Sequence, residues 1–284
     1  MTKPNSFTVL SALTEAKKIL AVVSETSSLD AHVLLAYITG GNRAWVVAHY
    51  EDFLSFEQID RFEEALSRLK NGEPLPYVLG EWEFYGLPFR ISPEVLIPRP
   101  ETELLVEKAI NWLKGKNKVS HVADAGTGSG IIPICIAKNI DDIEVTAIDI
   151  SGEAIKIAKK NIEWHDLTER INLIQNDLLK GIEIKFDLIT ANLPYIPTET
   201  LKELAVYKTE PTLALDGGDD GLDLIRKLLE QSVHYLNPGG IILLEIEYRQ
   251  GKKVIDMAKS YFPQAKITIH PDLAGHDRLV EIQT

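Results

Sequence analysis

The sequence predicts an α/β domain built on a mainly parallel sheet and preceded by a small all-helical domain. Two patterns carry this prediction. Roughly the first 70 residues place apolar side chains at helical spacing without a strand pattern, whereas short apolar strands alternate with helices after residue 119. Such alternation is typical of a parallel sheet with helices on both faces. The length of 284 residues is also sufficient for two domains.

The N-terminal part of the chain predicts three amphipathic helices, at residues 9–23, 31–38 and 56–69. Ser55 and Gln58 fit a capping box at the start of the third helix. Asn, Gly and Pro residues at 71–76 then break the helical pattern, which predicts a linker. We therefore assign residues 1–72 to a helical domain.

A β-hairpin is predicted between the two domains. Residues 81–92 alternate aromatic and polar side chains around Gly86, which is typical of two short strands and a tight turn. We assign residues 73–98 to the linker together with this hairpin. A further helix is expected at 101–113, where helical spacing resumes.

Residues 99–284 are expected to form the α/β domain. Its predicted strands lie at 119–125, 143–149, 171–175, 186–191, 241–247, 266–270 and 279–283. Its later helices are predicted near 130–139, 151–164, 222–236 and 249–260. About nine residues join the last two strands, too few for a parallel crossover, so we expect a seven-stranded sheet whose last strand is antiparallel.

Composition and charge limit the classes of function. With 30 basic and 42 acidic residues the net charge is -12, and no basic run exceeds a doublet, which argues against direct nucleic-acid binding. No apolar run is long enough to span a membrane, and the N-terminus lacks a secretory-signal pattern. We therefore expect a cytoplasmic monomer without membrane contact. Cys135, the only cysteine, is expected to be buried, and the scattered histidines predict no metal site.

A glycine-rich segment follows the first strand of the α/β domain. It has the sequence Asp124-Ala125-Gly126-Thr127-Gly128-Ser129-Gly130. Asp149 ends the next strand, where a carboxylate accepts hydrogen bonds from the hydroxyls of a ribose. The G-x-G-x-G spacing favours S-adenosylmethionine, which has no phosphate and whose ammonium group suits the acidic Asp124. A dinucleotide and a purely structural turn remain as alternatives.

Asn176 and Asp177 follow the third strand of this domain. Open α/β sheets bind ligands at the carboxyl ends of their strands, so the Asp177 carboxylate is a candidate acceptor for the amino group of an adenine. An ordinary Asx turn at the end of a strand is the alternative interpretation.

The fourth strand runs into a second candidate segment, Asn192-Leu193-Pro194-Tyr195-Ile196-Pro197. Its prolines fix φ, so the Asn192 amide oxygen and the carbonyl of residue 193 are expected to be held in one orientation. Two fixed acceptors grip an NH2 group, aim its planar nitrogen at a sulfonium methyl and stabilise the positive charge that develops. Tyr195 is expected to bound the amide plane. A proline turn with a packed tyrosine is the alternative.

Together these segments resemble the HemK/PrmC family of protein-(glutamine-N5) methyltransferases, a branch of the class I S-adenosylmethionine-dependent methyltransferases, which have a Rossmann-like fold. The resemblance covers essentially the whole chain. It extends to blocks at residues 79–81, 84–87, 96–103, 210–211, 221–223, 244–246 and 275–278.

The resemblance implies an activity and a substrate. The substrate would be the glutamine in the Gly-Gly-Gln motif of class I peptide chain release factors, and the products the methylated glutamine and S-adenosylhomocysteine. The helical domain would help to hold this protein substrate. Asn192, Pro194 and Tyr195 would be the catalytic residues.

The resemblance also implies roles for other residues. Asp124 and residues 126–130 would cradle the cofactor, Asp149 would bind its ribose, and Asp177 and Leu178 would border its adenine. Asn192 would lie between the cofactor and the substrate, and residues 192–195 would bind the glutamine. Arg99 and Glu101 belong to a block typical of the family. We place them at the substrate, with a structural ion pair or a helix start as the alternative.

Two positions depart from the family pattern. Leu193 stands where proline is usual, but this residue would act through its backbone carbonyl, so the chemistry is retained. Glu247 stands where glycine is usual. Three alternatives remain: a glutamine methyltransferase acting on a ribosomal protein, an adenine-N6 nucleic-acid methyltransferase that grips an exocyclic NH2 group, and a non-enzymatic module stabilised by the cofactor.

Overall fold

The computed structural model describes residues 7–284 except residues 25 and 117. The chain divides into two compact units, with the boundary after Glu81. Among the described residues, no helix combines the length and the apolar character needed to cross a membrane.

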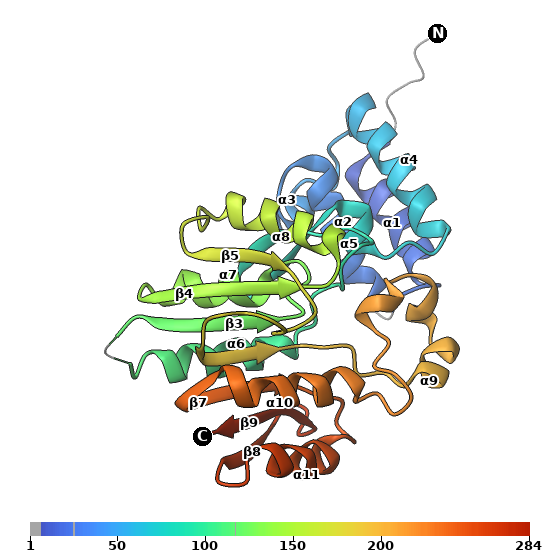
Figure 1. The fold of residues 1–284 in the computed structure, drawn as a ribbon. Coiled ribbons are helices and arrows are strands. Elements are labelled where there is room, and N and C mark those ends of the chain that lie inside the picture. Colours follow the sequence, from blue (N-terminus) through green and yellow to red (C-terminus); the bar gives the residue numbers. More distant parts are fainter. Residues whose placement is uncertain (1–6, 25, 117) are drawn as a thin grey trace. The chain divides into compact units, whose positions relative to one another are not determined.

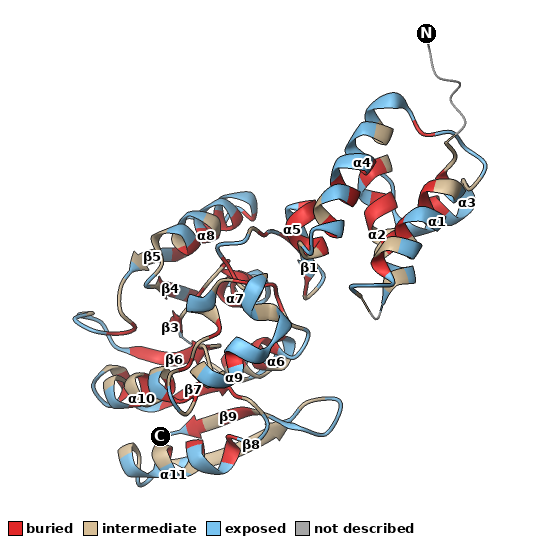
Figure 2. Ribbon diagram, turned by 90° about the vertical axis from the view of Figure 1, so that its right-hand side faces the viewer, coloured by how far each residue is buried: buried red, intermediate tan, exposed pale blue. Residues whose placement is uncertain are grey.

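The first unit is helical. Its helices are α1 (Val9–Leu20), α2 (Ser27–Thr39), α3 (Arg43–Ala48), α4 (Phe56–Lys70) and α5 (Leu75–Leu79). Helices α1, α2 and α4 pack on one another, and each contains buried residues, which are red in Figure 2. The predicted capping box is confirmed, since Ser55 and Gln58 exchange hydrogen bonds at the start of α4.

A short buried helix occupies part of the stretch where the sequence predicts a linker. All five side chains of α5 are buried, and this helix packs on α2 and α4. The Arg68 guanidinium of α4 donates to the carbonyl oxygens of Tyr77 and Val78 at 3.0 and 3.1 Å. Pro74 precedes the first turn and Pro76 lies within it, where a missing N–H group costs nothing.

The second unit begins with the predicted hairpin. Strands β1 (Glu81–Phe84) and β2 (Leu87–Arg90) pair through a turn at Tyr85 and Gly86. Both turn residues have positive φ, +52° and +71°, as a two-residue turn that follows the twist of the strands requires. Helix α6 (Thr102–Leu113) follows, close to its predicted position.

The predicted seven-stranded sheet is confirmed. Its strands are β3 (Ser120–Ala125), β4 (Ile143–Asp149), β5 (Ile171–Gln175), β6 (Phe186–Ala191), β7 (Leu236–Glu245), β8 (Lys266–Pro271) and β9 (Asp277–Gln283). They lie in the order β5-β4-β3-β6-β7-β9-β8. The pairs from β5 to β7 are parallel, and β9 is antiparallel to both of its neighbours, so the final strand is antiparallel as expected.

Helices cover both faces of this sheet. Helices α6, α7 (Ile131–Asn139) and α8 (Gly152–Trp164) lie on one face, and α10 (Asp223–Tyr235) and α11 (Gly251–Tyr261) lie on the other (Figure 1). Cys135 of α7 is fully buried, as predicted, and burial raises the pKa of its thiol. The connection between β6 and α10 contains three short elements that the sequence does not predict: α9 (Thr198–Glu203) and the 3-10 turns η1 (Ala205–Lys208) and η2 (Thr212–Ala214).

The strand order fixes where a ligand site can form. From β3 the chain proceeds to β4 and β5 on one side and then returns to β6 on the other. The loops after β3 and β6 therefore lie next to each other at the carboxyl edge of the sheet, where open α/β sheets bind ligands. Every side chain of β6 is buried, so the loop that follows it starts from a rigid strand.

Candidate active site

A cavity of about 450 Å³ lies at this carboxyl edge, a size typical of small-molecule sites. It is lined by residues that follow four different strands, together with segments around residues 93–99 and 211–214. The predicted site residues on its wall are Arg99, Gly126, Thr127, Gly128, Ser129, Asp149, Asp177, Leu178, Asn192, Leu193 and Pro194. Glu101, Asp124, Gly130 and Tyr195 lie outside the lining. The fold thus brings most of the predicted site residues together.

The glycine loop folds tightly against the end of β4. The N–H groups of Gly126 and Thr127 both donate to the carbonyl of Ile148, each at 2.8 Å. Gly126 has φ +75°, and a Cβ atom there would lie 2.8 Å from the Leu193 side chain. Gly128 has φ +55°, and a Cβ atom there would meet nothing within 4 Å. Gly126 therefore permits close packing of the two loops, while the backbone of Gly128 is open to a ligand.

Asp149 connects the end of β4 with the glycine loop. One carboxylate oxygen accepts the N–H of Gly128 at 2.8 Å, and the other accepts the N–H of Ser151 at 2.9 Å. Burial raises the pKa of this carboxyl, and the backbone hydrogen bonds from Ser151 and Gly128 oppose the rise. A carboxylate oxygen has two lone pairs, so each retains capacity to accept a further hydrogen bond from a ligand hydroxyl.

Asp124 lies beneath the loop rather than on the cavity wall. It is fully buried, and one carboxylate oxygen accepts the Thr190 hydroxyl at 2.7 Å. Burial raises its pKa to about 6, while Thr190 and Thr127 oppose the rise. Its other carboxylate oxygen has no hydrogen-bond partner among the described residues, and its predicted role at the cofactor stays a prediction.

The turn at Asp177 is braced from within. The Asn176 side chain donates to the carbonyls of Leu178 and Lys180, at 3.0 and 2.7 Å. Leu178 has φ +52°, a left-handed conformation that is rare for this residue type and clusters at functional sites. The Asp177 carboxylate pairs with Lys227 of α10. This carboxylate therefore lies on the cavity wall with a cation beside it.

Asn192 follows β6 and is fixed by a neighbour from α6. Its side-chain nitrogen donates to the Thr102 hydroxyl at 3.0 Å. The oxygen and the nitrogen of a primary amide lie on opposite sides of the group. The Asn192 amide oxygen therefore points away from Thr102 and can accept hydrogen bonds from other groups. Leu193, which stands where the family has proline, is buried, and its side chain packs over Gly126.

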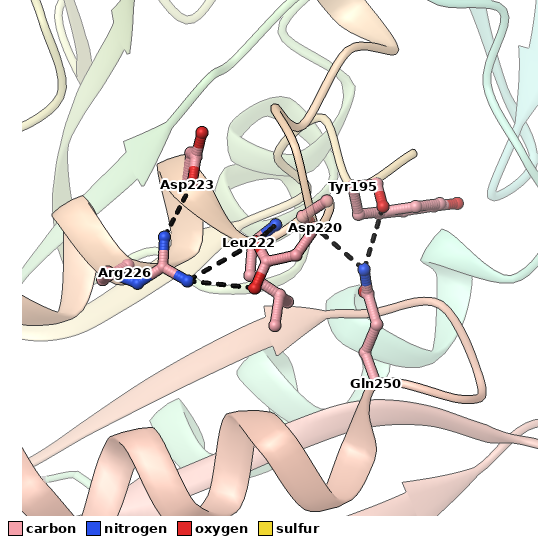
Figure 3. A network of polar contacts seen from close by, with 7 residues as sticks. Tyr195, Asp220, Leu222, Asp223, Arg226 and Gln250 are labelled. Atoms are coloured by element: carbon pink, nitrogen blue, oxygen red, sulfur yellow. Dashed lines mark hydrogen bonds and ion pairs between the residues drawn. The ribbon is translucent and has the colours of Figure 1, made fainter. Parts of the chain in front are cut away.

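Tyr195, in the loop that follows β6, is held through its backbone. The Gln250 side chain donates to the carbonyls of Tyr195 and Gly221, at 2.9 and 3.2 Å (Figure 3). The N–H of Glu247 donates to the Gln250 amide oxygen at 3.1 Å. Gln250 therefore ties residues 195, 221 and 247 together. Burial is the main cause that raises the pKa of the Tyr195 phenol to about 12, so it stays neutral at pH 7.

Arg99 has a structural partner, and Glu101 lies at a helix start. Arg99 forms an ion pair with Glu210, whose side chain is 3% exposed and also accepts the N–H of Ile97 at 3.2 Å. This pair joins the cavity segment around residue 99 to the segment that begins at Pro211. Glu101 is exposed and precedes the first residue of α6. Arg99 thus takes part in an ion pair and Glu101 lies at a helix start, while their placement at the substrate stays a prediction.

Glu245, the last residue of β7, is a buried carboxyl beside this site. It is 2% exposed, and neither carboxyl oxygen has a hydrogen bond of ordinary geometry among the described residues. Burial raises its pKa to about 7, and the Thr102 hydroxyl and the Arg278 charge oppose the rise. Folding thus disfavours the ionised form of this group.

The stability of Glu245→Gln relative to wild type is expected to increase as the pH rises. The pKa of Glu245 rises from 4.5 to about 7 on folding, so between these values the folded state retains a proton that the unfolded state has lost. Stability is therefore lost as the pH rises through this window, by roughly 3 kcal/mol in total. Urea unfolding of both proteins at pH 5 and pH 8 measures this effect. The free energy of unfolding of Glu245→Gln minus that of wild type should grow between the two pH values by up to about this amount. Equal differences at both pH values would contradict the expectation.

Four residues at this edge of the sheet make contacts that are not predicted from the sequence. They are Thr102, Glu210, Glu245 and Gln250. The first three lie inside blocks that resemble the family. The sequence therefore points to these positions but does not predict which contacts their side chains make. Across the described ranges, 7–24, 26–116 and 118–284, there is no group of three or more His, Cys, Asp or Glu side chains suited to a metal ion.

Comparisons with known proteins identify the family of this chain. A model of the PrmC N-terminal domain matches residues 11–80, and a model of the methyltransferase small domain matches residues 101–208. The release factor glutamine methyltransferase of Moorella thermoacetica is 40% identical over 274 residues, covering 95% of this chain and 96% of that protein. The enzyme of the same name from Rhodopirellula baltica is 39% identical over 267 residues, covering 92% and 90%.

A solved structure supports the fold. The crystal structure of a methyltransferase from Pyrococcus furiosus matches with a TM-score of 0.51 at 22% identity, covering 70% of this chain and 89% of that chain. The predicted methyltransferase fold and the resemblance stated from the sequence are both confirmed. With 40% identity over 95% of its length, the chain belongs to the release factor glutamine methyltransferase family.

Proposed function

We propose that this protein transfers a methyl group from S-adenosylmethionine to the side-chain amide nitrogen of the glutamine in the Gly-Gly-Gln motif of class I peptide chain release factors. One observation carries the proposal. A single cavity joins the glycine loop and Asp149, which suit a nucleoside cofactor, to the loop at Asn192, which suits an amide. Relatives of the same name over most of the chain support the choice of substrate.

The residues of the cavity fit S-adenosylmethionine. The open backbone of Gly128 allows close approach of the cofactor, and Asp149 has lone pairs for the two ribose hydroxyls. Asp177 and Leu178 would border the adenine, and the cofactor would supply a methyl group on a positively charged sulfur. Asp124 would support the glycine loop from below.

The loop after β6 would bind the reacting amide. The oxygen of Asn192 and the carbonyl of Leu193 would each accept one N–H of the glutamine side chain. Because an amide nitrogen shares its lone pair with the carbonyl, it is a poor nucleophile and depends on orientation. Effective molarity from positioning accounts for roughly 7 to 11 kcal/mol in well-oriented cases, so positioning is the main contribution we assign to this loop. Pro194 would stiffen the loop, and neutral Tyr195 would bound the amide plane.

The helical unit would contribute to recognition of the protein substrate. It corresponds to the matched PrmC N-terminal domain and lies outside the cavity lining. A reaction on release factors would place the protein in the cytoplasm with the translation machinery.

A methyl-transfer assay with labelled S-adenosylmethionine tests the proposal. The acceptors are a purified class I release factor, its variant with alanine in place of the Gly-Gly-Gln glutamine, a ribosomal protein and duplex DNA. We expect label only in the unmodified release factor. Label in the ribosomal protein or in DNA would overturn the substrate and keep the cofactor, whereas label in none would favour a non-enzymatic module.

A further inference from the structure

We propose that Thr102 is a positioning residue that holds the Asn192 side chain with its amide oxygen directed toward the substrate. The inference rests on the proposed function and goes further, because it assigns a reaction-related role to a residue outside the loop that grips the glutamine. Thr102 would not touch the reacting atoms. It would act through Asn192, whose orientation decides whether the substrate meets an acceptor or a donor.

The position of Thr102 is fixed by the fold. It is the first residue of α6 and is 0% exposed, although its segment borders the cavity. Helix α6 packs on β6 and β7, the strands that precede Asn192 and end at Glu245. The Thr102 hydroxyl therefore has little freedom to move, and it provides a fixed hydrogen-bond acceptor for the Asn192 side chain.

The direction of the hydrogen bond decides which end of the amide faces the substrate. In the structure the Asn192 nitrogen donates to the Thr102 oxygen at 3.0 Å. The reverse arrangement, with the Thr102 hydroxyl donating to the Asn192 oxygen, would present an NH2 group to the glutamine NH2. Two donors cannot bond, so only the observed orientation supports the reaction.

Glu245 is a second buried side chain near Thr102, at the end of the neighbouring strand. The strand register pairs Ala191 with Leu244, so Asn192 and Glu245 each lie one residue beyond the same pair. The Thr102 hydroxyl opposes the rise that burial causes in the pKa of Glu245, while neither Glu245 carboxyl oxygen has a hydrogen bond of ordinary geometry among the described residues. The direction of the contact is given by the hydrogen bond itself, in which the Asn192 nitrogen donates to the Thr102 oxygen at 3.0 Å.

Thr102→Val and Thr102→Ser test this inference. Valine keeps the shape of threonine and removes the hydroxyl, whereas serine keeps the hydroxyl. We expect Thr102→Val to lower kcat on the release factor about 30-fold, since a misplacement of about 1 Å at a reacting centre costs up to about 100-fold. The Kd for S-adenosylhomocysteine and the urea midpoint should change little, and Thr102→Ser should restore kcat to within about threefold of wild type. Thr146→Val, which removes another buried hydroxyl from β4, is the matched control.

The side-chain NH2 signals of Asn192 in nitrogen-15 NMR provide a readout that does not depend on activity. They are assigned by their loss in Asn192→Ala. A hydrogen-bonded, downfield proton should be present in wild type and Thr102→Ser and absent in Thr102→Val. Equal kcat in the serine and valine variants, or an unchanged NH2 signal in valine, would overturn the role of Thr102. If wild type fails to methylate the release factor, the proposed function fails, and the NMR comparison still decides the orientation.

Discussion

Asn192→Ala is expected to lower kcat about 1000-fold while the affinity for S-adenosylmethionine changes less than about threefold. The variant removes the acceptor that would aim the glutamine nitrogen and stabilise the positive charge developing on it. Removal of one preorganised hydrogen-bonding group at a transition state costs about 100- to 1000-fold, and Asn192 would also position the substrate. Its side chain bonds to Thr102 rather than to the glycine loop or Asp149, so the cofactor site should persist.

Single-turnover methylation and calorimetric titration with S-adenosylhomocysteine measure the two effects separately. Asn172→Ala is the matched control, because it removes an exposed asparagine side chain from β5 of the same sheet. This control should retain wild-type turnover. A variant at 192 that loses cofactor affinity as strongly as turnover would assign this amide to the cofactor rather than to the glutamine.

The sequence predicts the central strands of the sheet well because they are buried on both faces. The expected strand at 186–191 coincides with β6, a continuous buried run between polar segments. The antiparallel final strand follows from the length of one connection, because the residues between β8 and β9 are too few for a parallel crossover. The glycine loop and the Asn192 loop are found by sequence because both directly follow such strands.

Contacts between distant segments are the part that the sequence does not predict. Thr102 and Asn192 are 90 residues apart, and Arg99 and Glu210 are 111 residues apart. No local pattern encodes these pairs, because only the strand order brings their segments together. The same limit explains α5, where prolines suit both a linker and a helix start, and burial against α2 and α4 decides in favour of the helix.

Asp149→Ala is expected to weaken S-adenosylhomocysteine binding about 100-fold or more. The carboxylate would accept both ribose hydroxyls, and hydrogen bonds to charged groups contribute about 1.5 to 3 kcal/mol each. At saturating cofactor, kcat should fall far less than in Asn192→Ala. Isothermal titration gives the affinity, with Glu153→Ala as the control that removes another carboxylate from the cavity wall. Unchanged affinity in Asp149→Ala would show that the ribose assignment is wrong.

Asp149 also bonds to the N–H groups of Gly128 and Ser151, so its loss alters the glycine loop as well. A double-mutant cycle separates these effects, using S-adenosylhomocysteine and its 2′-deoxyribose analogue as ligands. If Asp149 binds the ribose, the missing hydroxyl should weaken binding to wild type about 10-fold and to Asp149→Ala hardly at all. An equal loss in both proteins would mean that the carboxylate shapes the loop without contacting that hydroxyl. A coupled loss would place the nucleoside at the end of β4, which leaves the loop after β6 for the amide.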